Sequence, residues 1–99
     1  MALYALALAV DVRIPEAHSL KEKRSVIRTI LDGSRRRFGA STAETGHQDD
    51  HQRAELGFVV VAGEARHAAD VIDAVERFVW SFPEIEVVAG DRHWMEVER

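Results

Sequence analysis

Residues 2–14 alternate large and small side chains with a period of two, and this pattern constrains the fold more than any other stretch. The even positions from Tyr4 to Ile14 are large, and the odd positions are small or polar apart from Leu3. Period two is the repeat of a β-strand, whose successive side chains point to opposite faces of a sheet. The pattern therefore predicts a long strand that turns its large side chains toward a core and ends before Pro15.

The next stretch, residues 19–38, has the spacing of an amphipathic helix. Apolar side chains recur along one stripe at intervals of three, four and seven residues. Ser19 is the expected N-cap, and Glu22 three residues later completes a capping box. Gly39 is a natural residue to follow the helix, whereas Gly33 inside it is expected to cost about 1 kcal/mol relative to alanine.

This helix carries most of the positive charge of the chain. It holds seven of the thirteen lysines and arginines and only two acids, so its charge is +5, whereas the whole chain is −4. One edge of its apolar stripe forms a basic ridge of Lys21, Arg24, Arg28 and Arg35. We expect the basic ridge, with Lys23 beside it, to bind RNA phosphate or an acidic partner. The alternative is a solvated face whose long side chains cover the edge of the core.

The rest of the chain continues the alternation of strand and helix patterns. The expected elements are a weak strand at 40–45, a buried strand at 54–62 and a helix at about 64–81. A last strand is expected at 85–89, and residues 94–97 are expected to continue it after a break at Gly90. This order predicts an α+β, ferredoxin-like βαββαβ fold: a four-stranded antiparallel sheet with both helices on one face. Residues 1–99 then form a single domain with the first and third strands at its centre.

The second face of that sheet, which we call the open face, is expected to be small and apolar. A contiguous apolar patch is unfavourable in water, so a partner subunit or the chain's own tail around Trp94 should cover it. The expected interface of a homo-oligomer contains Leu3, Ala5, Ala7, Ala9, Val59 and Val61. RNA-recognition sheets stack bases on aromatic side chains, which this face lacks, so RNA binding through the sheet is not expected. Trp80 and Trp94 are expected to be internal packing residues and not base-stacking ones.

Motifs for catalysis and cofactor binding are missing from the sequence. The chain has no cysteine, which excludes disulfides, thiol catalysis and cysteine-ligated zinc. It has no glycine-rich phosphate loop and no hydrolase or zinc-protease signature. We therefore expect no enzymatic activity and no cofactor. The apolar residues 2–10 are too few to span a bilayer and do not resemble a signal peptide, so a cytoplasmic protein without a membrane partner is expected.

The polar segment around His47 and His51 is the one candidate for a metal site. Imidazole and carboxylate groups, here with Asp49 between the histidines, are suitable ligands for metal-dependent phosphoesterase chemistry. The histidine spacing suits a helix, however, and this segment has the composition of a loop. We expect no metal site here. The alternatives are a solvated loop or a loop whose backbone is hydrogen-bonded by Gln48 or Gln52.

Six short blocks of sequence carry a resemblance to a known family. They are Ser-Leu-Lys-Glu-Lys-Arg at 19–24, Arg-Phe at 37–38, Ala-Glu at 43–44, His-Gln-Asp at 47–49, Gln-Arg-Ala at 52–54 and Phe-Pro-Glu at 82–84. Together they resemble the YlxP-like family of small bacterial proteins, which is catalogued as a domain of unknown function. The resemblance implies a ferredoxin-like fold and no established activity. Genes of that family tend to lie among genes for translation initiation and ribosome maturation, which implies a role near RNA or the ribosome.

These observations lead to one main expectation of function and one alternative. The main expectation is a non-enzymatic accessory protein of translation or ribosome maturation that uses the basic ridge. The alternative is a homo-oligomeric ferredoxin-like domain that binds a small ligand or a protein partner.

Overall fold

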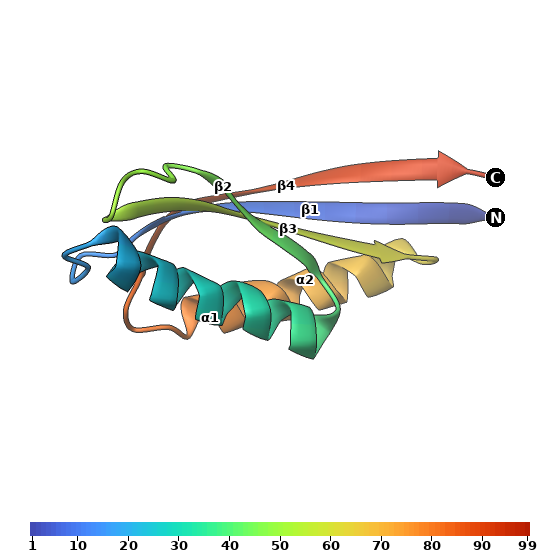
Figure 1. Ribbon diagram of the computed structural model, residues 1–99. Coiled ribbons are helices and arrows are strands. Elements are labelled where there is room, and N and C mark those ends of the chain that lie inside the picture. Colours follow the sequence, from blue (N-terminus) through green and yellow to red (C-terminus); the bar gives the residue numbers. More distant parts are fainter.

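The computed structural model describes residues 1–99, and it confirms the expected order of elements (Figure 1). The elements are β1 (Ala2–Arg13), α1 (Leu20–Phe38), β2 (Ser41–Gly46), β3 (Arg53–Ala62), α2 (Ala65–Trp80) and β4 (Glu86–Glu98). The strands form one antiparallel sheet in the order β2-β3-β1-β4, so β1 and β3 are central as predicted. Both helices lie on one face of the sheet, which is the ferredoxin-like arrangement.

The core lies between the sheet and the two helices. The even positions of β1 point into it: Leu6, Leu8, Val10 and Val12 are each exposed by 2% or less. These side chains lie beside the inward-facing residues of β3, for example Leu8 opposite Phe58. Burying one large apolar side chain contributes about 1.5–3 kcal/mol, so the β1–β3 pair forms the stabilising centre of the fold. Neither helix is long and apolar enough to cross a membrane.

The ends of α1 are formed by the residues that the sequence indicates. The Ser19 hydroxyl accepts a hydrogen bond from the Glu22 amide at 3.1 Å, and the Glu22 carboxylate accepts one from the His18 amide at 2.9 Å. Gly39 adopts the left-handed conformation, with φ of 66°, and its amide donates to the Arg35 carbonyl. Because these caps satisfy backbone groups at both ends, they define where α1 begins and ends.

Gly33 lies where α1 packs against α2, and its role differs from the one expected. A Cβ atom at this position would lie 2.6 Å from Cζ of Phe78, which is far inside van der Waals contact. The Phe78 ring also contacts Phe38 and Phe82 edge-to-face, with centroid distances of 5.8 and 5.1 Å. Gly33 therefore permits the close approach of α2, and a residue that weakens an isolated helix allows the two helices to pack.

Strand β4 is one continuous edge strand, and the expected break at Gly90 is wrong. Gly90 pairs regularly with Val10. The irregularity lies two residues earlier: Ala89 is opposite Asp11 and Val87 is opposite Val12, which leaves Val88 without a partner in β1. A bulge absorbs one extra residue without ending the ladder, so β4 remains paired with β1 along its whole length. Figure 1 shows both strands continuing beyond the helices to the adjacent chain termini.

Candidate functional site

The basic ridge lies on the solvent side of α1, and all four of its members are exposed. Three of them line a groove of about 370 Å³ between α1 and the edge strand β2. The groove is lined by Arg24, Ile27, Arg28, Leu31, Asp32, Arg35 and Glu44. Its apolar residues come from the inner stripe of α1, and its arginines come from the outer edge of the same helix.

Charge is distributed unevenly along this groove. The carboxylate of Asp32 forms an ion pair with Arg35, and that of Glu44 forms one with Lys23. Arg24 and Arg28 form no ion pair and no side-chain hydrogen bond with the rest of the chain. These two arginines are four residues apart, so they project from adjacent turns on one side of the helix. The groove therefore presents two unneutralised guanidinium groups, each able to bind a phosphate or carboxylate through two hydrogen bonds.

Lys23 does not belong to the ridge, which corrects the expectation from the sequence. Its side chain is completely buried. Its ammonium nitrogen lies 2.9, 3.3 and 3.1 Å from the backbone oxygens of His47, Gln48 and Arg53, and 2.9 Å from the Glu44 carboxylate. Phosphate in solution cannot reach this group while the loop is folded. The helical spacing of the sequence already indicated that Lys23 faces the core, because it is four residues before the core residue Ile27.

The ammonium group of Lys23 faces more oxygen atoms than it has protons. Three protons cannot serve four oxygens fully, so the ammonium group shares its donors among the three carbonyls and the charged Glu44 carboxylate. Oε2 of Glu44 is buried, and the Lys23 ammonium at 2.9 Å is its partner. Lys23 thus joins α1 to β2 and to the β2–β3 loop, and Glu44 supplies the compensating charge.

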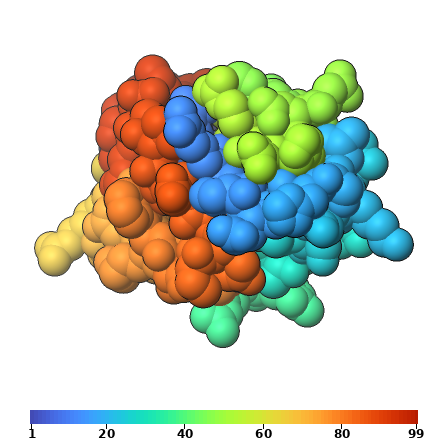
Figure 2. Space-filling view, turned by 90° about the vertical axis from the view of Figure 1, so that its left-hand side faces the viewer, coloured from blue at the N-terminus to red at the C-terminus, as the bar shows by residue number.

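The β2–β3 loop, residues 47–52, is held by several side chain to backbone hydrogen bonds. The amide of the Gln48 side chain donates to the Glu44 carbonyl at 3.0 Å. The side-chain amide of Gln52 donates to the backbone carbonyls of Pro15 and Ala17 at 3.2 and 3.3 Å. In Figure 2 this yellow-green loop lies directly against the blue segment that precedes α1. The loop residues are exposed, as for a solvated loop, and the alternative in which Gln48 or Gln52 hydrogen-bonds backbone groups also holds.

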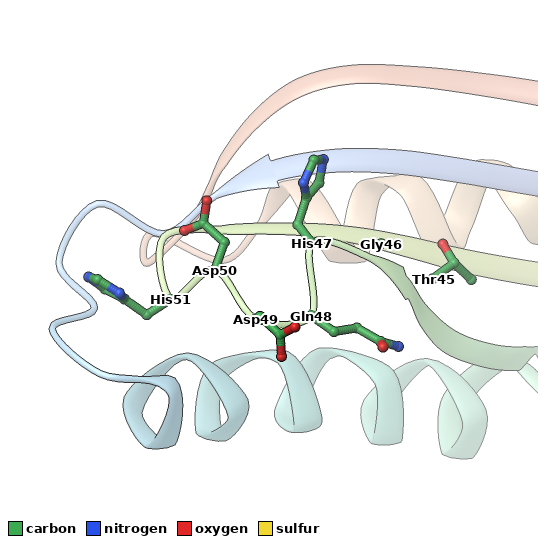
Figure 3. A pocket seen from close by; sticks show the side chains of 7 residues that line it. All are labelled: Thr45, Gly46, His47, Gln48, Asp49, Asp50 and His51. Carbon is green, nitrogen blue, oxygen red and sulfur yellow. The ribbon is translucent and has the colours of Figure 1, made fainter.

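The histidines of the loop point in different directions. The loop surrounds an open hollow of about 680 Å³ lined only by residues 45–51. Figure 3 shows the His47 side chain pointing away from α1, whereas His51 points toward the outer end of the loop. No group of three or more histidine, cysteine or acidic side chains is arranged to hold a metal ion. His47, Asp49 and His51 therefore do not form a common site in this arrangement, and the expected lack of metal binding stays a prediction.

The open face is uncovered, as the helices lie on the other side of the sheet. Of the residues expected at an interface, Val59 and Val61 are exposed by 39% and 62%, Ala5 is buried between its neighbours, and the others are half-buried. The tail does not fold over this face, because Trp94 lies opposite Leu6 within β4. The expectation that both tryptophans pack internally is wrong. Trp80 is 62% exposed at the end of α2, and Trp94 is 52% exposed on the edge strand.

Comparison with known proteins gives a family and a fold. Residues 6–92 match a family of proteins of unknown function, DUF503. The chain is 37% identical over 81 residues to the uncharacterized protein YlxP of Bacillus subtilis (strain 168), covering 82% of this chain and 88% of that protein. It is also similar to the solution structure of a de novo designed protein with a ferredoxin fold, with a TM-score of 0.50, 16% identity, and coverage of 91% and 83% of the two chains. That structural likeness concerns the fold alone.

Proposed function

We propose a function from the premise that the chain belongs to the DUF503 family of proteins of unknown function, as its resemblance to the YlxP-like proteins predicted. The proposed function is that of a non-enzymatic, cytoplasmic accessory protein that binds RNA in translation or ribosome maturation. The observation that carries the proposal is the pair of unneutralised arginines, Arg24 and Arg28, along the groove between α1 and β2. RNA phosphate is the ligand that suits such a pair, because guanidinium groups bind it through two hydrogen bonds.

The surroundings of the two arginines support a local, rather than general, affinity for RNA. The chain as a whole is acidic, with a net charge of −4, so its overall field repels nucleic acid. Lys21 and Arg35 extend the positive strip on either side of the pair. Ile27 and Leu31 form the floor of the groove but are only 3% and 7% exposed, so the groove offers a ligand its charged groups and little apolar surface. We therefore expect RNA contact to be confined to this edge of the molecule.

Changing Arg24 and Arg28 together to glutamine tests the proposal. Each phosphate contact adds about 0.7–0.9 to the slope of log affinity against log salt concentration. The double variant is expected to reduce that slope by up to about 2, and to do so equally for RNAs of unrelated sequence. Fluorescence anisotropy with several labelled RNAs over a range of salt concentrations measures this slope. Folding stability should change by less than about 0.5 kcal/mol, because both side chains are exposed.

A matched control changes Arg36 and Arg66 to glutamine. Both are exposed and lie outside the basic ridge, so the control removes the same charge from elsewhere on the surface. Its salt slope should remain that of the parent protein. If the control lowers the slope as much as the ridge variant, the attraction is a general charge effect. If the ridge variant unfolds and its folded fraction keeps the parent slope, the two arginines are structural and the proposal is wrong.

A second candidate function is self-association through the open face, favoured by the observation that neither the helices nor the tail covers it. Ala7 lies at its centre, between Val59 of β3 and His93 of β4. Ala7→Glu is expected to separate the subunits or to destabilise the domain, because it places a charge among apolar neighbours. Sedimentation and thermal unfolding would measure this, with Ser25→Glu on the exposed side of α1 as the control. A parent monomer whose Ala7→Glu variant melts at the same temperature would contradict it.

A further inference from the structure

The edge strand β4 is the most exposed element of the chain. Twelve of its thirteen residues are exposed, and Val87 is the exception. Of the eight large hydrophobic side chains that are exposed, four lie on this strand: Val88, Trp94, Met95 and Val97. Only β1 pairs with β4, so the backbone groups on its outer side have no partner within the chain. A long, apolar edge of this kind is a template for pairing with another strand.

The apolar side chains of β4 lie on both faces of the sheet. Trp94 is opposite Leu6, so it lies on the side of the helices. Met95 and Val97 are opposite Ala5 and Leu3, so they lie on the open face. A partner stacked on the open face would cover Met95 and Val97 but would leave Trp94 in water. A strand added along the edge of β4 would lie beside all three side chains, and this geometry favours strand addition.

The sequence of β4 is complementary to itself in one antiparallel register. When a two-fold axis passes through Trp94, this residue is opposite Trp94 of a second copy, and Arg92 is opposite Glu96 of that copy. The symmetry repeats the charge pair on the other side of the axis. Cross-strand aromatic pairs and pairs of opposite charge are the contacts that stabilise antiparallel strands. Moving the axis by one residue places Trp94 opposite Glu96 or Arg92 and loses the aromatic pair.

The two charged residues of this register differ in their partners, because Arg92 forms ion pairs within its own chain and Glu96 forms none. Arg92 is fixed at the edge by ion pairs with Asp73 and Glu76 of α2, at 2.8 and 3.2 Å, and its side chain stays 31% exposed. Glu96 and Glu98 lie on the same side of the strand. A side-chain hydrogen bond with Glu98, followed by desolvation and repulsion from its charge, raises the pKa of Glu96. Glu96 forms no ion pair within its own chain, and Arg92 of a second copy would supply a cation.

We propose that the protein forms a symmetric dimer in which β4 pairs antiparallel with β4 of a second copy, with the two-fold axis at Trp94, to give one continuous eight-stranded sheet. The dimer does not use the basic ridge, because α1 packs against β2 at the opposite edge of the sheet. It also leaves the open-face residues of β1 and β3 free. In this dimer the two basic ridges lie at the two outer edges of the sheet, so one dimer presents two separate binding surfaces.

The absence of cysteine from the chain allows a direct test of the register. A Trp94→Cys variant is expected to form an intermolecular disulfide under mild oxidation, because this position faces itself across the axis. Asp91→Cys is the matched control. It faces Val97 of the second copy, and two Asp91 positions lie on the order of 20 Å apart at the rise of a strand. A mixture of Arg92→Cys and Glu96→Cys proteins should form the mixed disulfide in preference to either symmetric one.

Sedimentation equilibrium tests whether Trp94 stabilises the dimer. The parent protein is expected to dimerise, and Trp94→Asp to weaken the dimer by about 30-fold or more, as for an interface hot spot. Trp80→Asp removes a tryptophan outside β4 that is more exposed, 62% against 52%, and should leave the affinity unchanged. A parent that stays monomeric at about 100 μM, or cross-linking of Asp91→Cys instead of Trp94→Cys, overturns the proposal. The proposal is also overturned if Ala7→Glu dissociates the dimer and Trp94→Asp does not, because that result assigns self-association to the open face.

Discussion

Replacing Lys23 with methionine is expected to lower the free energy of unfolding by about 3–5 kcal/mol, the usual cost of removing one partner from a buried ion pair. Methionine has a similar length and fits the buried volume, so the loss comes from polar groups and not from packing. Three backbone carbonyls and the Glu44 carboxylate would remain facing the site without a donor. Unpaired buried acceptors carry the full cost of their desolvation.

Urea denaturation of the parent and variant proteins measures this loss. Lys21→Met is the matched control, because Lys21 is on the same helix and exposed, and its effect should stay within about 0.5 kcal/mol. Adding Glu44→Gln to Lys23→Met should recover part of the stability, since a neutral amide replaces the uncompensated carboxylate. If Lys23→Met is as stable as Lys21→Met, the four oxygen contacts of Lys23 do not hold the loop.

The same variant separates a structural role from an RNA-binding role. Under native conditions, Lys23→Met that remains folded should keep the parent dependence of RNA affinity on salt, because its ammonium group is shielded from solvent. The Arg24 and Arg28 double variant should show the converse, with unchanged stability and a smaller salt slope. Loss of salt slope in Lys23→Met would show that the loop, and not only the ridge, contributes to RNA binding.

Lys23 also shows which part of the structure the sequence could predict. Strand and helix periods, the Ser19 cap and the βαββαβ order depend on residues near one another in the chain, and these predictions are confirmed. The burial of Lys23 depends on where the β2–β3 loop lies in space, which no local pattern specifies. Lysine is rarely buried without partners, so the charge of Lys23 favoured a prediction of exposure even though its spacing places it on the apolar stripe. A cationic residue at a core position was the available signal for an anchoring role.

The candidate site was predicted only in part, because it also depends on how segments far apart in the chain lie in space. The four exposed members of the basic ridge follow from the helical period, but their groove also requires β2 to lie beside α1 as the sheet edge. The exposure of Trp94 could not be foreseen either. Alternation placed this residue on one face of a strand, but α2 packs against β1 and β3 and leaves Trp94 of β4 52% exposed.

Gly33→Ala is expected to lower the free energy of unfolding by about 1–3 kcal/mol, the opposite of what helix propensity predicts. Propensity alone favours alanine over glycine in a helix interior by about 1 kcal/mol. The added Cβ, however, would lie 2.6 Å from Cζ of Phe78. That ring cannot move aside freely, because Phe38 and Phe82 contact it edge-to-face and Arg37 lies over it at 5.0 Å.

A double-mutant cycle with Phe78→Leu separates the two effects of Gly33→Ala, since coupled neighbours depart from additivity. In the Phe78→Leu background the aromatic ring is gone, so alanine at position 33 should be neutral or stabilising through its helix propensity. Thermal unfolding of the four proteins measures the coupling. A higher melting temperature for Gly33→Ala in the parent background would show that α2 shifts at little cost. The close approach of the two helices at Gly33 would then be a consequence of the glycine and not a requirement of the fold.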